Sequence, residues 1–303
     1  MNLRDAVVLV TGPARGIGAE TARLLAARGA RLALVGLEPE RLAALAAELG
    51  DGHAWAECDV TDQASLERAV AAMVAAHGRI DVVVANAGIA SHGTVATTSA
   101  DAMARTIAVN LVGVVRTVAV TLPHVRARRG YFLLVSSAAA IAPLPGIAAY
   151  AASKSGVEQF ANVLRLELAH VGVGVGTAHP SWIATEMVSD PRGDLPAFDA
   201  VLGTLPGPFG RVTPVRQCAE AFVAAIEGRR RKVYVPASVG AFAIIRQLIT
   251  SRLGDAVMRW RGRELVPQLE REVIALGRAF GAHSVEARKD VQATGGGDGR
   301  AEG

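Results

Sequence analysis

The sequence predicts a doubly wound α/β fold, in which helices cover both faces of one parallel sheet. Short apolar runs alternate with longer helical patterns along most of the chain, which is the βαβ rhythm of a parallel sheet. Most of these runs are continuous Val, Leu, Ile and Ala without polar alternation, as expected for strands that are buried on both faces. A glycine-rich turn joins the first apolar run directly to the first helical pattern.

Seven apolar runs are predicted to be strands, and they cover residues 6–10, 31–35, 54–58, 80–85, 131–135, 173–178 and 232–235. The helical patterns between them cover residues 17–28, 39–49, 63–77, 104–126, 150–171 and 214–227. Each pattern is long enough for the crossover that connects two parallel strands. The sequence therefore predicts a seven-stranded parallel sheet within one domain, residues 1–236.

Two segments depart from this rhythm. Residues 180–213 contain too many prolines and glycines for a long helix and are too long for an ordinary connection, so we expect a substrate lid there. Residues 237–283 follow the last strand and are predicted to form a helical extension, with helices at 239–253 and 255–280. The glycine-rich residues 284–303 are predicted to be a disordered tail.

The composition limits the class of protein. Hydrophobic residues make up 51% of the 303 residues and charged residues 20%, which is typical of a globular chain. The formal net charge is +4, but only 4% of the residues are aromatic, which argues against a nucleic-acid partner. Cys58 and Cys218 lie far apart and in no metal-binding spacing, so we expect neither a disulfide nor a metal site. The first apolar run is too short for a signal peptide, which favours a cytoplasmic protein.

The glycine-rich turn at residues 11–18 reads Thr-Gly-Pro-Ala-Arg-Gly-Ile-Gly and predicts a dinucleotide site. Gly12 allows the tight turn, Gly16 lets the backbone approach a pyrophosphate at the helix N-terminus, and Gly18 lets the helix pack closely on the strand. A glycine-rich turn without a ligand is the alternative, because this motif is weak when it occurs alone. Its place between the first strand and the first helix favours the dinucleotide.

Further motifs follow in an order and spacing that resemble the short-chain dehydrogenase/reductase family over residues 5–236. The resemblance rests on residues 11–18, Asp59-Val60, Asn86-Ala87-Gly88, Asn110, Ser137 and Tyr150-Ala151-Ala152-Ser153-Lys154. It implies a Rossmann-type fold and an NAD(P)-dependent oxidoreductase that acts on CH–OH groups. One departure is Pro180-Ser181, where the family usually has Pro-Gly.

The resemblance, together with the glycine turn, assigns one set of positions to the nicotinamide cofactor. They are Gly12, Arg15, Gly16, Ile17, Gly18, Asp59, Val60, Asn86, Ala87, Gly88, Tyr150, Lys154, Pro180, Ile183 and Thr185. By the resemblance, Asp59 and Val60 would border the adenine. Ile183 and Thr185 would contact the nicotinamide half of the cofactor.

Tyr150 and Lys154 are separated by four positions on a predicted helix, so their side chains project from the same face one turn apart. A tyrosine that exchanges protons near neutrality needs about 4 kcal/mol of preferential phenolate stabilisation, which a nearby ammonium and an oxidised nicotinamide can supply. By the resemblance, Tyr150 exchanges the substrate proton, Ser137 orients the substrate oxygen and Asn110 anchors a relay water. Lys154 would lower the pKa of Tyr150 and bind ribose. The alternatives are that Asn110 caps backbone groups, that Ser137 only ends a strand and that the Tyr-Lys spacing arises by chance.

The end of the second predicted strand bears on the choice between NAD(H) and NADP(H). Gly36 occupies the place where NAD-binding relatives usually carry an acid, which leaves room for a 2′-phosphate. Arg15 can offer its guanidinium to that phosphate. Against this, Glu38 can bind the ribose hydroxyls, and Leu37 stands where many NADP-binding relatives carry an arginine. We therefore predict a preference for NADP(H), with NAD(H) as the alternative.

The residues expected to line the substrate crevice are nearly all apolar. They are residues 138–141, Leu144, Trp182, Met187, Phe198, Leu202 and Phe209. Such a lining favours a lipophilic alcohol, aldehyde or ketone as substrate. A cofactor-binding sensor or scaffold without turnover is the second hypothesis, but such a protein would not need Ser137, Tyr150 and Lys154 together.

Two kinds of contact with larger partners are expected. By the resemblance, the helices at 104–126 and 150–171 form the interface of a homodimer or homotetramer. In the extension, arginines such as Arg246 and Arg259 alternate with apolar residues such as Phe242 and Trp260. This pattern is typical either of peripheral contact with an anionic membrane or of a helix packed on the domain or on a second subunit.

Overall fold

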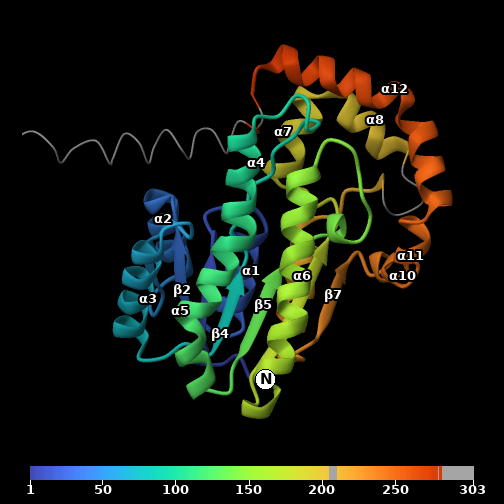
Figure 1. Cartoon of the computed structure of the whole chain (residues 1–303). Helices are drawn as coiled ribbons and strands as arrows, with labels where there is room; N and C mark the ends of the chain where they lie inside the picture. The colour runs from blue at the N-terminus through green and yellow to red at the C-terminus, as the bar shows by residue number, and fades with distance from the viewer. Residues whose placement is uncertain (205–209, 279, 282–303) are drawn as a thin grey trace, which may run out of the picture.

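The computed structural model describes residues 1–204, 210–278 and 280–281, and its centre is a seven-stranded parallel sheet (Figure 1). The strands are β1 (Val7–Thr11), β2 (Arg31–Gly36), β3 (Ala54–Glu57), β4 (Val82–Ala85), β5 (Tyr131–Val135), β6 (Gly174–Pro180) and β7 (Lys232–Val235). They pair in the order β3-β2-β1-β4-β5-β6-β7. The predicted fold class and the seven predicted strands are confirmed, with strand ends that differ by no more than two residues.

The order of the strands reverses between β1 and β4, which are neighbours in the sheet. The chain proceeds outward from β1 through β2 to β3, and then from β4 in the opposite direction. In an open α/β sheet, such a reversal leaves a crevice outside the carboxyl ends of the strands. The glycine turn of residues 11–18 follows β1 at this point.

Alternate residues of β1 pack in two separate cores. Val8 and Val10 belong to one core, and Val7 and Leu9 belong to the other. All of them are fully buried. Burial on both faces explains why the central strands are uninterrupted apolar runs in the sequence.

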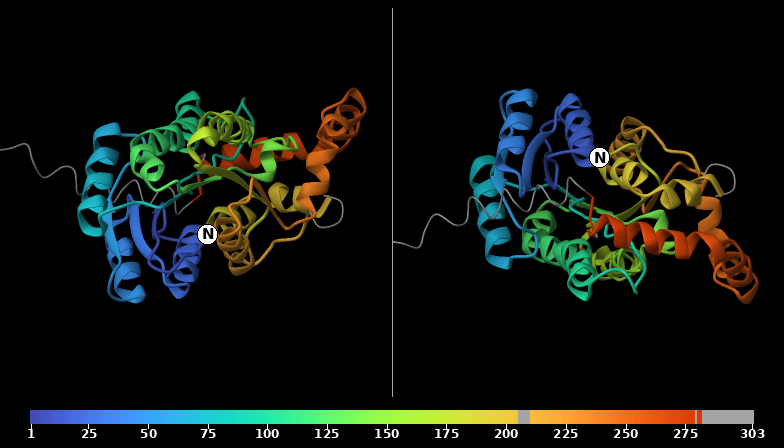
Figure 2. Two further views of the ribbon diagram at one scale, coloured as in Figure 1. Left: turned by 90° about the horizontal axis from the view of Figure 1, so that it is seen from below. Right: turned by 90° about the horizontal axis from the view of Figure 1, so that it is seen from above.

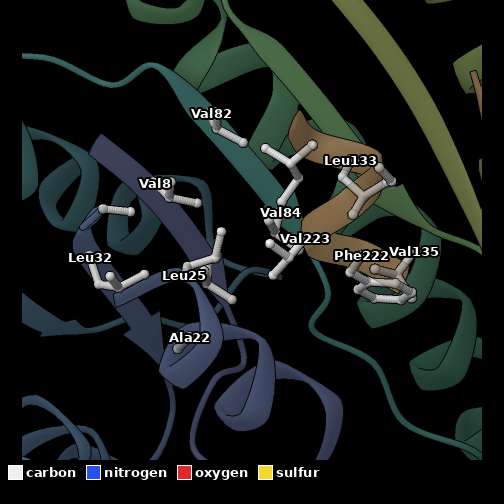
Figure 3. Packing of buried hydrophobic residues seen from close by; sticks show 14 of the residues in the cluster. Val8, Ala22, Leu25, Leu32, Val82, Val84, Leu133, Val135, Phe222 and Val223 are labelled. Atoms are coloured by element: carbon white, nitrogen blue, oxygen red, sulfur yellow. The ribbon is translucent and has the colours of Figure 1, made fainter. Parts of the chain in front are cut away.

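Helices form one layer on each face of the sheet, as both views in Figure 2 show. The first layer consists of α1 (Gly16–Ala27), α2 (Pro39–Leu49) and α9 (Val215–Glu227). From these helices Leu25 and Phe222 enter the core shown in Figure 3. The second layer consists of α3 (Gln63–His77), α5 (Gly113–Ala127) and α6 (Ala148–Leu168).

The helix predicted at residues 104–126 begins earlier, with α4 (Ala100–Ile107). It starts there because the hydroxyl of Ser99 caps it by accepting a hydrogen bond from the amide of Ala102. The helix then passes through a π-helical turn (Ala108–Val112) into α5. In the described part of the chain, this continuous segment is the one helix that is long and apolar enough, by length and composition, to cross a membrane. In this fold it packs against α3, α6 and β4.

The lid and the extension contain more helices than predicted. Residues 180–213, the predicted lid, carry α7 (Glu186–Asp194) and α8 (Pro196–Thr204), and the extension carries α10 (Val239–Ile244), α11 (Arg246–Ile249) and α12 (Arg252–Leu276). The single helix predicted at 239–253 is therefore wrong. The chain leaves helical geometry at Ile245 and Thr250, each the second of two adjacent β-branched residues. Ser251 then caps α12 by accepting a hydrogen bond from the amide of Gly254.

The last long helix lies at the carboxyl end of the sheet. Figure 1 shows α12 above α7 and α8, and α12 contacts α8 directly. Leu269 and Val273 of α12 pack there with Leu195 and Ala197 of the lid. The predicted tail, residues 284–303, lies outside the described residues.

Candidate active site

The glycine turn after β1 allows a ligand to approach the backbone. Gly12 and Gly16 have φ values of +64° and +57°, in the left-handed region that favours glycine. A side chain at Gly12 would place its Cβ 2.9 Å from the Cα of Ala87, and one at Gly18 would come within 2.6 Å of the Nδ2 of Asn86. Side chains are therefore excluded at both positions. The amides at the N-terminus of α1 stay accessible to an anion such as a pyrophosphate, so the turn fits a dinucleotide.

Asn86 holds the segment after β4 against this turn. Its Nδ2 donates hydrogen bonds of 3.1 Å to the carbonyl oxygens of Thr11 and Gly12. The Thr11 hydroxyl accepts hydrogen bonds of 3.0 Å from the amides of Asn86 and Ala87. This arrangement fixes two neighbouring strand ends relative to each other at the point where the strand order reverses.

A cleft of about 410 Å³ lies beside the glycine turn, outside the carboxyl ends of the strands. Most of the predicted cofactor positions line it: Gly12, Arg15, Gly16, Ile17, Asp59, Val60, Asn86, Ala87, Gly88, Tyr150, Lys154, Pro180 and Thr185. Gly18 instead packs beneath the turn, and Ile183 lines a second pocket. Sequence reasoning missed Cys58, Ile89, Arg105, Val109, Val135, Ser136 and Glu186. All of these except Arg105 and Val135 adjoin a predicted position in the sequence, so adjacency was the available signal.

Arg15 and Glu38 form an ion pair at the edge of this cleft. Glu38 also lies 3.5 Å from the guanidinium of Arg41, and Arg15 lies 4.0 Å from the carboxylate of Glu186. The side chains of Arg15 and Glu38 are 19% and 18% exposed, so solvent screens their interaction only in part. The guanidinium predicted to take a 2′-phosphate is thus paired with the carboxylate that was expected to bind the ribose hydroxyls.

The structure brings Tyr150, Lys154 and Ser137 together. Tyr150 and Lys154 lie one turn apart near the start of α6, as predicted. The buried Lys154 ammonium lies 5.7 Å from the centroid of the Tyr150 ring and donates a 2.9 Å hydrogen bond to the carbonyl oxygen of Val135. Ser137 follows β5, and its hydroxyl accepts a 3.1 Å hydrogen bond from the amide of Ala139 and lies close enough to Tyr150 to influence the pKa of that residue.

Burial changes the proton affinity of both titratable groups. It raises the pKa of Tyr150 above its ordinary value, and the nearby side chain of Ser137 opposes this rise. Burial also lowers the pKa of Lys154 to about 8. The expected lowering of the Tyr150 pKa by Lys154 is therefore not found in the protein chain alone, where burial is the largest cause of the shift. The charge of an oxidised nicotinamide is the other source of phenolate stabilisation.

Asn110 is fully buried in the π-helical turn. Its side chain accepts a 2.8 Å hydrogen bond from the amide of Ile89 and donates one of 2.9 Å to the carbonyl oxygen of the same residue. It also donates to the hydroxyl of Ser153 at 3.2 Å. Asn110 thus caps backbone groups after Gly88 and connects them to α6. Its role in a proton relay stays a prediction.

A smaller pocket of about 140 Å³ adjoins the cleft, and Tyr150 lines both cavities. The pocket contains Ser137 and these predicted wall residues: Ala138, Ala139, Ile141, Leu144, Trp182 and Met187. Phe209 and the side chains of Phe198 and Leu202 lie outside the described part of the protein. Val239 and Phe242 of α10 also line the pocket, and no local signal in the sequence connected the extension with it.

Comparison with known proteins agrees with this geometry. The family model for short chain dehydrogenases matches residues 6–195. This chain belongs to the short-chain dehydrogenase/reductase family. It is 40% identical over 196 residues to the D-threitol dehydrogenase of Mycolicibacterium smegmatis, an alignment that covers 62% of this chain and 75% of that protein.

Solved structures of family members share the fold. The alcohol dehydrogenase of the archaeon Thermococcus sibiricus, complexed with 5-hydroxy-NADP, has a TM-score of 0.66 and 26% identity, covering 76% of this chain and 95% of that one. The 3-ketoacyl-(acyl-carrier-protein) reductase of Brucella melitensis, complexed with NADH, has a TM-score of 0.70 and 25% identity, covering 77% and 97%. This family member is therefore an NAD(P)-dependent oxidoreductase that acts on CH–OH groups. The family match ends at residue 195, so the extension lies outside it.

Proposed function

We propose that the protein is a cytoplasmic oxidoreductase that interconverts a small lipophilic alcohol and its aldehyde or ketone with NADP(H). The observation that carries this proposal is the place of Tyr150, which lines both the cleft beside the glycine turn and the apolar pocket. A group at that boundary can exchange a proton with a substrate oxygen whose carbon faces the cofactor. The nicotinamide supplies or accepts the hydride.

Ser137 and Tyr150 act on the substrate oxygen. Ser137 lines the apolar pocket beside Tyr150, so its hydroxyl can orient an oxygen that Tyr150 protonates during reduction and deprotonates during oxidation. Lys154 lines the cleft, where its ammonium can bind ribose hydroxyls and favour the phenolate. The apolar walls of the pocket keep water away from the reacting atoms.

Tyr150→Phe tests this assignment, because the phenyl ring keeps the packing and loses only the hydroxyl that carries the exchangeable proton. We expect turnover to fall by more than about 100-fold, while the Kd for NADPH changes by less than about twofold. Turnover is followed by nicotinamide absorbance and binding by calorimetry. An active Phe variant contradicts the role of Tyr150. A wild-type protein that binds the nucleotide tightly and turns over no substrate supports the sensor hypothesis instead.

We propose a modest preference for NADP(H) over NAD(H). Arg15 lines the cleft and can bind a 2′-phosphate, whereas the adjoining Glu38 repels it. Glu38→Gln should therefore raise the NADP-to-NAD ratio of kcat/KM by about fivefold, since a partly exposed charge contact is worth about 1 kcal/mol. Glu40→Gln, at an exposed position on the same helix, is the matched control. A wild-type protein that favours NAD contradicts the proposal.

The mainly apolar pocket supports a lipophilic substrate. A substrate panel should pair aliphatic and aryl secondary alcohols and their ketones with polyols. D-Threitol belongs in the panel, because the relative from Mycolicibacterium smegmatis carries it in its name. The highest kcat/KM is expected among the apolar compounds, and a clear preference for polyols would reverse the assignment of substrate class.

We propose that the protein assembles as a homodimer or homotetramer through α4, α5 and α6. These helices and the π-helical turn between α4 and α5 expose apolar side chains, namely Ile107, Val112, Val115, Val163 and Leu166. Such surfaces are typical of subunit contacts. Light scattering measures the assembly, and a monomer at micromolar concentration contradicts it.

Peripheral membrane contact is the weaker of the two alternatives for the extension. Ile244, Leu248 and Trp260 are exposed, but the C-terminal half of α12 packs on the lid through Leu269 and Val273. Co-sedimentation with anionic liposomes, with and without residues 237–303, separates membrane contact from packing alone.

A further inference from the structure

A histidine outside the predicted site contacts the backbone of Ser137. His179 is fully buried near the end of β6, directly before Pro180, which lines both cavities. Its Nδ1 lies 3.3 Å from the carbonyl oxygen of Ser137. Because a carbonyl oxygen only accepts, Nδ1 carries the hydrogen and donates it. The ring is also stacked on Tyr234, with centroids 5.2 Å apart.

The other edge of this ring faces a buried carboxylate. Nε2 of His179 lies 3.9 Å from Oε1 of Glu158, and within the described part of the protein it is buried without a hydrogen bond. Glu158 follows Lys154 by one turn of α6. Its carboxylate accepts hydrogen bonds from Lys232 at 2.7 Å and from Arg246 at 3.0 Å. Arg246 belongs to α11, so the C-terminal extension supplies one of the two cations.

We propose that His179 is a positioning residue for Ser137. The neutral imidazole holds the Ser137 carbonyl through its Nδ1 hydrogen, and protonation of Nε2 draws the ring toward Glu158 and weakens that hold. This inference rests on the role proposed above for the Ser137 hydroxyl. It gives the extension a function at the active site, because Arg246 sets how strongly Glu158 attracts a second proton to the ring.

The charges around the ring favour the neutral form. Burial lowers the pKa of His179, Glu158 opposes this effect, and Lys232 and Arg246 add to it. Tyr234 faces the ring with its own aromatic face. Removing Arg246 should therefore raise the pKa of His179, and removing the charge of Glu158 should lower it further.

Two substitutions at His179 separate the hydrogen bond from the packing. His179→Phe keeps a ring for Tyr234 but has no donor for Ser137, and His179→Asn has a donor near the position of Nδ1 but does not titrate. We expect kcat of H179F to fall about tenfold, the scale of one lost hydrogen bond, with the Kd for NADPH unchanged. H179N should recover most of kcat and lose the acid limb that His179 contributes to the pH–rate profile.

Opposite shifts at the two charged neighbours provide the second test. Histidine NMR titration of the full chain should show a higher pKa for His179 in Arg246→Gln and a lower one in Glu158→Gln, and the acid limb of the pH–rate profile should move in the same directions. Arg252→Gln, at an exposed arginine of the same extension, is the matched control and should shift neither. If E158Q does not fold, the pKa of His179 in R246Q alone still tests the inference.

Several results would overturn the inference. They are an unchanged kcat in H179F, a pKa of His179 that R246Q leaves unchanged, and shifts of the same sign in R246Q and E158Q. Failure of the proposed function has a different signature, because Ser137→Ala would then retain turnover. The NMR titration does not depend on turnover and distinguishes the two cases.

Discussion

Leu269→Ala should loosen the contact between α12 and the substrate side of the molecule. Leu269 is 6% exposed and packs with Leu195, Ala197 and Trp182. It also lies directly against the loop before α6, because a Cβ on Gly146 would come within 2.6 Å of its Cδ2. Trp182 lines the apolar pocket, so this cluster connects the extension to the pocket wall.

The magnitude follows from the size of the cluster. Truncating a buried leucine to alanine costs about 2–5 kcal/mol in protein cores, and for this small cluster we expect about 2–3 kcal/mol. The cluster is separate from the two cores against the sheet, so the loss should act on local opening of α12 rather than on global unfolding. Local opening should then become about 30- to 150-fold more frequent.

Amide hydrogen exchange of α12, read by mass spectrometry, measures this opening directly. The KM for substrate should rise, because the pocket wall loses support, while the Kd for the cofactor should not change. Ile274→Ala is the matched control, since Ile274 lies on the same helix and is 69% exposed. Exchange in L269A as slow as in the wild type would refute the reasoning, and so would an equal increase in I274A.

Two further substitutions concern residues that line the cleft beside the glycine turn. Gly12→Ala should lower cofactor affinity by at least tenfold, because its Cβ would collide with Ala87. Gly29 also has a positive φ, but the Cβ of Gly29→Ala would meet Arg4 only at an ordinary contact distance of 3.5 Å. This substitution should therefore cost only the backbone strain and leave affinity unchanged in nucleotide titrations. Lys154→Met should raise the free energy of unfolding at pH 7 by about 2 kcal/mol, since a buried ammonium with a pKa of about 8 against 10.5 when unfolded destabilises the fold below pH 8. The unfolded chain binds more protons between pH 8 and 10.5, so wild-type stability should rise with pH there, and urea unfolding should show the gain of K154M shrinking by pH 10.

The central strands could be predicted because burial on both faces leaves an uninterrupted apolar run. The edge strand β3 (Ala54–Glu57) alternates between half-buried and exposed residues, and its run in the sequence is correspondingly less apolar. Helix ends were harder to predict, since they depend on caps rather than on hydrophobicity. Ser99 caps the start of α4 before the apolar pattern becomes recognisable, and Ser251 caps the start of α12 directly after α11.

Contacts between segments that are distant in the sequence could not be predicted, because they leave no local pattern in it. Arg15 could be assigned to the site because it lies inside the glycine turn, but its pairing with Glu38 depends on how closely the turn and the end of β2 approach each other. Arg246 was interpreted as part of a basic face of the extension. In the fold it reaches Glu158, 88 positions earlier, because α11 lies beside α6. The available signal was the position of Glu158, one helical turn beyond Lys154. A carboxylate that is buried there, as the structure shows, needs a cation as its partner.

The two halves of the site differ in how far a sequence can specify them. The residues that line the cleft beside the glycine turn all lie between positions 12 and 187, within the family match. A dinucleotide requires glycines, amides and charges at fixed places on the strand ends. The substrate pocket demands only an apolar wall of the right shape, which many side chains at many positions can provide. Here Val239 and Phe242 complete that wall from beyond the family match, while Arg246 of the same extension contacts α6. The motifs therefore predict the redox chemistry, whereas the shape of the apolar pocket depends in part on a segment whose contribution is defined only by the folded chain.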